Sequence, residues 1–450
     1  MVLAIGHWVS SSGSDHDASP YYPAARSRLS TRMLESGTIG NVQAFLLMGN
    51  YLQKRDRPNT GYNLIGIAFR MALGLGLHRE FPPGVAGNDI LAQERRRQLW
   101  WILYCFESGF SITTGRPTTA SAAFIDTRMP RNVEDLNSTL DDSLPLPVDY
   151  PTTHSAIIAQ AHLAVIANKI HNDFLSAHMN NGDVDPEVVQ NMEQQLYAWK
   201  SFLPPYFMDS NVPQWFRGPR AVVLWKEQNL RIMLWYGAQR SNNIGLNKAN
   251  AVQKCQLAAI ETIQDVSTFC KEQSDLLHAG LSWYAIYFLF QATLVLDISL
   301  LQSADQPHNE VTPSPLDDTV SLARDCLSKI GLRNSAATRC ISVLDRIHEH
   351  LASTKATSGQ AFPNMAWDPY PTFTRRTTPQ ALTMDNNHWT FTVDPTLHMF
   401  LDNPSVENLL EGIEGFPSTQ EQQFFDYTSG NLYNTEDGQS LMTWPNTNFI

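Results

Sequence analysis

Three blocks between residues 40 and 130 decide the fold, and they read GNVQAFLLMGNYLQKRDRPNTGYNLIGIAFRMALGLGLHRE (40–80), ERRRQLWWILYCFESGFSITTGRP (94–117) and AAFIDTRMP (122–130). In the first two blocks apolar residues recur at intervals of three and four, which places them on one face of a helix. The pattern predicts a short helix over 42–52. It predicts a second helix capped by Asn59 or Thr60 and a third that begins at Glu94 and ends at Gly115.

Two features inside these blocks call for particular contacts. Gly66, Gly74 and Gly76 each weaken a helix by roughly 1 kcal/mol relative to Ala, so we expect them where another backbone approaches closely. Arg116 ends a largely apolar helix, and a buried guanidinium must be paired. We predict an ion pair with one of three carboxylates, namely Glu107, Glu94 or Asp126. The alternative is that Arg116 anchors an anionic ligand.

Several short motifs follow one another in a fixed order across these blocks. They are Val42-Gln43-Ala44 with Leu46-Leu47, Pro58-Asn59-Thr60-Gly61, Ile67-Ala68, Gly76-Leu77-His78-Arg79-Glu80, Arg95-Arg96-Arg97, Leu99-Trp100-Trp101, Ser111, Gly115-Arg116-Pro117, and Asp126 before Pro130. In this order the motifs resemble the middle homology region of fungal binuclear-zinc-cluster transcription factors, in the style of the galactose-pathway activators. The structural signature that the resemblance assigns comprises Gly76, His78, Arg79, Arg96, Trp100, Trp101, Gly115, Arg116 and Pro117.

The resemblance implies a nuclear regulator of RNA polymerase II transcription, with metabolic genes of the carbohydrate type as targets. It implies DNA binding and homodimerisation through an N-terminal six-cysteine, two-zinc cluster and a dimerising helix. The five cysteines here are scattered and none has Cys-x-x-Cys spacing, so we expect no zinc, other metal or cofactor in these 450 residues. Either the sequence is part of a longer protein, or direct DNA binding has been lost. The expected partners are DNA through that cluster, coactivator or inhibitor proteins and a small-molecule effector.

The chain divides into three parts by composition. Residues 1–38 are a poorly patterned lead-in that contributes a partial helix. Residues 39–355 form the regulatory domain, an all-α bundle or irregular solenoid with long loops, because further helical patterns follow and no strand pattern or repeat occurs. These patterns cover 155–179, 186–204, 220–240, 247–273, 281–301, 316–332 and 335–352. Residues 356–450 form a disordered acidic and aromatic tail.

The tail carries most of the net charge. Residues 377–450 contain ten Asp and Glu and no Lys or Arg, so they hold −10 of the net charge of −12. Aromatic residues lie among these carboxylates, a composition typical of activation segments that a coactivator groove captures. The candidate contacts are Trp389, Phe391, Phe400, Phe424, Phe425 and Trp444. A solvated tail without a partner is the alternative. The near-neutral remainder lacks the surplus positive charge that binding to nucleic acid requires.

Other conspicuous features favour structural explanations. We expect Arg95-Arg96-Arg97 to lie in the solvated first turns of a helix rather than on DNA phosphates. Residues 281–301 approach the length of a membrane span, but Asp297 and other polar residues favour a buried central helix, and we expect no membrane contact. The histidines lack ligand spacing, and no catalytic motif appears, so we expect no enzyme. The rival classes are a stand-alone helical coregulator or scaffold, and an all-α enzyme whose site lies in a deep cavity.

Overall fold

The computed structural model describes most of residues 1–357. It leaves out residues 11–19, 56, 82–89, 120, 135–144, 180–182, 242, 244, 246, 305–314, 333 and 358–450. The six aromatic residues of the candidate activation segment, Trp389 to Trp444, lie outside the described residues.

Every regular element in this described part is helical, which confirms the all-α prediction. The elements are α1 (Val2–Ser10), α2 (Tyr21–Arg26), α3 (Thr31–Glu35), α4 (Ile39–Gln53), α5 (Pro58–Gly74), α6 (Ile90–Thr113), η2 (Ala122–Phe124), α7 (Ser155–Met179), α8 (Pro186–Phe202), η4 (Pro205–Phe207), α9 (Gln214–Arg240), α10 (Lys248–Glu272), η5 (Ser274–Leu276), α11 (Ala279–Ala304), α12 (Pro315–Gly331) and α13 (Ser335–Thr357).

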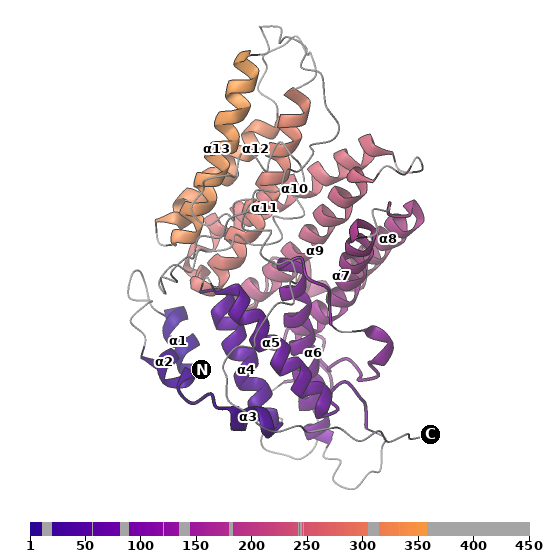
Figure 1. Cartoon of the computed structure of the whole chain (residues 1–450), viewed down its shortest axis with the longest axis vertical. Coiled ribbons are helices and arrows are strands. Elements are labelled where there is room, and N and C mark those ends of the chain that lie inside the picture. Colours follow the sequence, from indigo (N-terminus) through magenta and orange to yellow (C-terminus); the bar gives the residue numbers. More distant parts are fainter. Residues whose placement is uncertain are drawn as a thin grey trace, which may run out of the picture.

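The helices form two halves that meet around α7 and α9. In Figure 1, α1–α6 occupy the lower part of the view, α10–α13 the upper part, and α7–α9 lie between them. The buried side chains of α4, α5 and α6, together with Ala161 and Ala164 of α7, make one cluster, which we call the N-terminal core. The buried side chains of α7 to α13 make a larger cluster, the C-terminal core. Helix α7 contributes to both cores and therefore joins the two halves.

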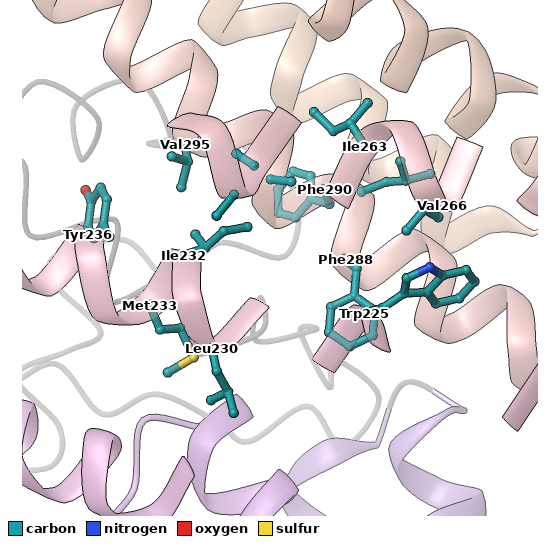
Figure 2. Close-up of a cluster of buried hydrophobic side chains, with 14 of the residues drawn as sticks. Trp225, Leu230, Ile232, Met233, Tyr236, Ile263, Val266, Phe288, Phe290 and Val295 are labelled. Atoms are coloured by element: carbon teal, nitrogen blue, oxygen red, sulfur yellow. The ribbon is translucent and has the colours of Figure 1, made fainter. Parts of the chain in front are cut away.

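The C-terminal core is built around α9, α10 and α11. Figure 2 shows side chains from these helices converging, among them Trp225 and Phe288. The Trp225 ring lies edge-on to Phe269 at 5.3 Å and to Phe288 at 6.3 Å between ring centroids. Such aromatic pairs stabilise a core by about 0.5–1.5 kcal/mol beyond the area they bury.

Helix α11 is buried along most of its length, as expected from its composition. The segment Ala279–Leu300 is the one helix among the described residues that is long and apolar enough to cross a membrane, but 78% of its most apolar window is buried against other helices. Its residues Ala285, Leu289 and Leu296 are completely buried in the C-terminal core. The segment therefore acts as the central core helix in this fold.

Two helices begin with a side-chain cap close to where their sequence patterns begin. Asp185 accepts a hydrogen bond from the Glu187 amide at 2.9 Å and precedes Pro186, the first residue of α8. Asn247 accepts from the Asn250 amide at 3.1 Å at the start of α10. Both side chains satisfy backbone N–H groups that have no partner inside the helix.

Other helix starts were predicted too late. Helix α5 begins at Pro58 rather than at a cap on Asn59 or Thr60, since proline suits the first helical position. Helix α6 begins at Ile90, before Glu94. Helix α9 begins at Gln214 rather than Arg220, because its first turn places Phe216 fully inside a cluster with Tyr206 and Phe207.

The lead-in contributes more to the core than its pattern suggests. Helix α1 buries Ala4 and Trp8 against Met48, Tyr51 and Leu52 of α4. The Trp8 ring lies edge-on to Tyr51 at 6.0 Å. The first nine-residue helix is too short to show a clear apolar stripe, so only its tertiary contacts reveal that it belongs to the fold.

Helices α4 and α5 cross in backbone contact through two glycines. A Cβ atom on Gly49 would lie 2.8 Å from Ile65 and 3.0 Å from the Gly61 carbonyl oxygen. A Cβ atom on Gly61 would lie 2.9 Å from the Gly49 carbonyl oxygen and 3.0 Å from the Phe110 ring. A close backbone approach therefore occurs at Gly49 and Gly61, and the prediction that placed it at Gly66, Gly74 and Gly76 was wrong. Gly66, Gly74 and Gly76 have open space around them.

Candidate functional site

Two glycines of the structural signature end helices in the same way. Gly76 follows α5 with φ of 67°, and Gly115 follows α6 with φ of 60°. The Gly76 and Leu77 amides donate to the carbonyl oxygens of Leu73 and Ala72, both at 3.0 Å. At the end of α6, the amides of Gly115 and Arg116 repeat this pattern. These are Schellman motifs, whose left-handed residue strongly favours glycine.

A buried charge network links the loop after α5 to the start of α6. Arg97 is 8% exposed, and its Nη1 atom lies 3.0 Å from Glu94 Oε2. Its Nε atom lies 3.1 Å from both carboxylate oxygens of Glu80, and Arg97 Nη2 forms a further close contact with that carboxylate. The two carboxylates also accept hydrogen bonds from backbone amides. The Arg128 amide donates to Glu80 at 3.1 Å, and the Arg131 amide donates to Glu94 at 2.7 Å.

This network also governs the charge of its members. Burial opposes ionisation of Glu80, but the hydrogen bonds from Arg97 and Arg128 outweigh it and lower the pKa of Glu80. Hydrogen bonding to Glu80 is the main cause that raises the pKa of Arg97. Glu80 and Arg97 therefore remain ionised, and the network ties residues 126–131 to the first turns of α6.

The three consecutive arginines occupy three different environments. Arg95 is exposed, Arg96 donates to the Leu75 carbonyl at 2.9 Å with its guanidinium 4.5 Å from the centre of the Phe81 ring, and Arg97 is buried. The expectation of a solvated arginine run was wrong for Arg97, because its carboxylate partner Glu80 lies on a different element. The three side chains do not form one basic patch for phosphates.

The remaining residues near α6 support the same local structure. Trp100 is fully buried beside Phe69 and His78, and the Trp101 Nε1 atom donates to the Arg128 carbonyl at 2.9 Å. The His78 carbonyl accepts from the amides of Asp126 and Thr127. Arg79 is exposed and pairs with Asp126 at 3.0 Å, and Pro117 is exposed after the Schellman motif.

Arg116 does not form the predicted ion pair. Its guanidinium donates to Asn59 Oδ1 at 2.7 Å and lies 4.3 Å from the centre of the Tyr62 ring. Of the proposed partners, Glu94 binds Arg97 and Asp126 binds Arg79. Glu107 is buried and accepts from the Thr119 amide at 2.7 Å. Arg116 is only half-buried, so a neutral amide and an aromatic face suffice as partners.

The signature residues thus shape the fold, and they do not converge on a reactive centre. Within the described residues no group of three His, Cys, Asp or Glu side chains is placed to hold a metal ion. The pKa of the buried Cys105 thiol is raised to about 12 by burial, which keeps it a neutral thiol.

A separate cavity lies where the two halves meet. It encloses about 870 Å³ of empty space, including its open mouth. Its walls come from the end of α4, from α6 and α7, and from α9 and α11, so both cores contribute. The aromatic part of the lining consists of Phe106, Phe110, Trp283, Tyr284, Tyr287 and Phe288. In Figure 2, the lining residues Leu230 and Met233 project from α9 on the side of the violet helices.

Two lysines face this aromatic wall. The Lys54 Nζ atom lies 5.0, 5.2 and 5.7 Å from the ring centres of Tyr284, Trp283 and Phe106. The Lys226 Nζ atom lies 5.6 Å from the Tyr284 ring centre and donates to Gln160 Oε1 at 2.7 Å. Burial, and then the charge of Lys226, lower the pKa of Lys54 to about 7. Burial also lowers the pKa of Lys226.

Sequence reasoning did not find this cavity. Lys226 lies on α9, whereas Lys54 directly follows α4 and the lining residue Gln53, so the two lysines are far apart in the chain, and neither belongs to a motif. The only available signal was the unusual placement of Lys226 within an apolar helical pattern.

Comparisons with known proteins agree with the resemblance seen in the motifs. Residues 1–201 match the family described as "Fungal specific transcription factor domain". The lactose regulatory protein of Kluyveromyces lactis is 36% identical over 174 residues, which cover 38% of this chain and 18% of that protein.

Two other relatives match over more of the chain. Activator of stress genes 1 of Saccharomyces cerevisiae is 25% identical over 344 residues, 74% of this chain and 35% of that protein. An uncharacterized transcriptional regulatory protein of Schizosaccharomyces pombe is 26% identical over 370 residues, 78% of this chain and 43% of that protein. The chain therefore spans less than half the length of these relatives. Residues 1–201 are thus similar to the family of fungal specific transcription factor domains, and the relatives similar to this chain are named as fungal transcriptional regulators.

Proposed function

We propose that this chain is the regulatory part of a fungal transcription factor that controls genes transcribed by RNA polymerase II. The observation that supports it most is the family match over residues 1–201, which include the whole N-terminal core. The relatives named as transcriptional regulators match up to 78% of the chain. A role without catalysis agrees with the ion pairs of this region, because Arg79 pairs with Asp126 and Arg97 pairs with Glu94 in structural contacts.

The proposal assigns each part of the chain a task. The helical body controls how strongly the transcription factor activates transcription. Residues 356–450 recruit coactivators through their aromatic side chains, which the neighbouring carboxylates keep solvated. DNA contact and homodimerisation belong to a zinc cluster and a dimerising helix that these 450 residues do not contain, and the protein acts in the nucleus. Metabolic genes of the carbohydrate type are the proposed targets, in keeping with the name of the lactose regulatory protein.

A reporter assay tests the activation half of the proposal. Residues 356–450 fused to an unrelated DNA-binding domain should activate transcription, and replacing Trp389, Phe391, Phe400, Phe424, Phe425 and Trp444 by Ala should remove most of that activity. A matched control replaces six Asn or Gln residues of the same segment by Ala and should retain it. A silent wild-type fusion would refute the activation role.

The same assay tests control by the helical body. A fusion that carries all 450 residues should activate less strongly than the fusion of residues 356–450, because the body limits access to the tail. Equal activity of the two fusions at equal protein levels would contradict this control.

A further inference from the structure

The cavity between the two halves has a charge composition that is unusual for a protein interior. Two ammonium groups, those of Lys54 and Lys226, flank the ring of Tyr284 at 5.0 and 5.6 Å from its centre. None of the described residues that line the cavity is acidic. Lys54 donates a hydrogen bond to the neutral side chain of Asn50, and Lys226 donates one to the neutral side chain of Gln160. Like charges in an apolar setting repel one another, so this arrangement is costly without an anion.

The rest of the lining limits what that anion can be. Trp283 stacks on Tyr287 with an interplanar angle of 8°, and Tyr284 stacks on Phe288 with one of 16°. These rings, with Leu230 and Met233, form an apolar wall that would not replace the water around a small inorganic ion. A suitable ligand therefore has two parts. Its flat apolar group packs against the aromatic wall, and its carboxylate or sulfonate group pairs with the lysines.

We propose that this cavity binds a small organic anion whose acidic group pairs with Lys54 and Lys226 and whose flat apolar body lies against Trp283, Tyr284 and Tyr287. The walls belong to α4, α6 and α7 on one side and to α9 and α11 on the other, so the ligand bridges the two cores. Such a ligand stabilises one relative placement of the halves by its contacts with both. Its use as a regulatory signal rests on the proposed function, but the binding itself does not.

The binding test uses a matched pair of fluorescent probes on the complete 450-residue chain. 1-Anilinonaphthalene-8-sulfonate carries a permanent negative charge, and N-phenyl-1-naphthylamine is the same ring system without the sulfonate. Lys54→Gln and Lys226→Gln should each weaken binding of the anionic probe about tenfold or more, because each removes a charge-assisted hydrogen bond. Binding of the neutral probe should change little. Lys169→Gln, at an exposed lysine of α7, is the control and should leave both probes unaffected.

Three further measurements help to interpret the binding result. Gly109→Leu places a side chain at a lining position where a Cβ atom meets nothing within 4 Å, so it should weaken both probes by filling the cavity. Circular dichroism should show the same helicity for the lysine variants as for the wild type and no loss of thermal stability, because each variant removes a like-charge repulsion. Affinity for the anionic probe should fall between pH 6 and pH 9 as Lys54 loses its proton.

Three results would overturn the proposal. They are no saturable binding of the anionic probe, unchanged binding in both lysine variants, and equal loss of both probes in the lysine variants. The reporter assays measure transcription and not probe binding. A failure of the proposed ligand site can therefore be distinguished from a failure of the proposed transcriptional role.

Discussion

The N-terminal and C-terminal cores are both helical, but different kinds of contact specify them. The N-terminal core depends on single residues with special properties: two glycines at a backbone crossing, two left-handed glycines at helix ends, and Arg97 between two carboxylates. The C-terminal core depends mainly on many interchangeable apolar contacts along α9, α10 and α11.

This difference explains where a recognisable motif is found. A left-handed turn or a backbone crossing accepts almost only glycine, and a bidentate ion pair accepts almost only arginine. A core of aliphatic side chains keeps its structure through many substitutions that conserve volume. Residues 1–201, which match the family, contain the N-terminal core, whereas residues beyond 201 supply most of the C-terminal core.

The largest expected effect is the loss of Arg97. Arg97→Ala leaves Glu80 and Glu94 without their charged partner, and breaking a buried pair in this way costs about 3–5 kcal/mol. Arg95→Ala, at the exposed neighbour, should change stability by less than about 0.5 kcal/mol. Urea denaturation followed by circular dichroism at pH 7 measures both. Similar small effects for the two variants would mean that the network does not specify the N-terminal core.

Asp297 provides the opposite case in the C-terminal core. This residue of α11 is completely buried, and neither carboxylate oxygen has a hydrogen-bond partner among the described residues. Burial raises the pKa of Asp297 from 3.8 to about 7, although the charge of Arg324 opposes the shift. An acid whose pKa is raised in the folded state binds more protons there than in the unfolded state, so folding stability falls as pH rises from about 4 to 7.

Asp297→Asn should remove this pH-dependent cost. The variant should be more stable than the wild type by about 2–4 kcal/mol at pH 8, and the gain should shrink toward zero near pH 4. Thermal melts at pH 5 and pH 8 measure the change. Asp318→Asn, at an exposed carboxylate at the start of α12, is the control for the change of charge and should alter stability by less than about 0.5 kcal/mol. A gain of equal size at both pH values would contradict the assigned titration.

The sequence was sufficient for the elements that local chemistry defines. The patterns that begin at 186 and 247 and the apolar pattern of α11 gave the right helices, because the deciding interactions, such as the caps that the structure shows at Asp185 and Asn247, lie within a few residues. The burial of Arg97 and the partners of Arg116 were missed. In both cases the deciding partner, Glu80 or Asn59, lies on another element, and a local pattern carries no information about it.

The candidate site shows the same limit more strongly. Motifs identified the residues that build the N-terminal core, but the cavity arises only when α4 and α9 are brought together in space. Lys54 lies in a charged run at the end of α4, where a solvated side chain is the ordinary expectation. Its aromatic surroundings come from α6 and α11, which sequence spacing does not relate to it.

The smallest effect is expected from alanine substitutions at two glycines of α5. Comparing the stability of the two variants tests whether backbone contact specifies the N-terminal core. Gly61→Ala inserts a methyl group 2.9 Å from the Gly49 carbonyl oxygen, which forces α4 and α5 apart and should cost about 1–3 kcal/mol. Gly66→Ala lies one and a half turns along α5 in open space, so the gain in helix propensity should stabilise the protein by about 0.4–1 kcal/mol. Urea denaturation measures the free energy of unfolding of both variants. Because helix propensity favours alanine at both positions, a difference between them reports the backbone contact at Gly61. Stabilisation by both substitutions would show that the crossing can relax, and the glycine contact would then lose its role in fixing this core.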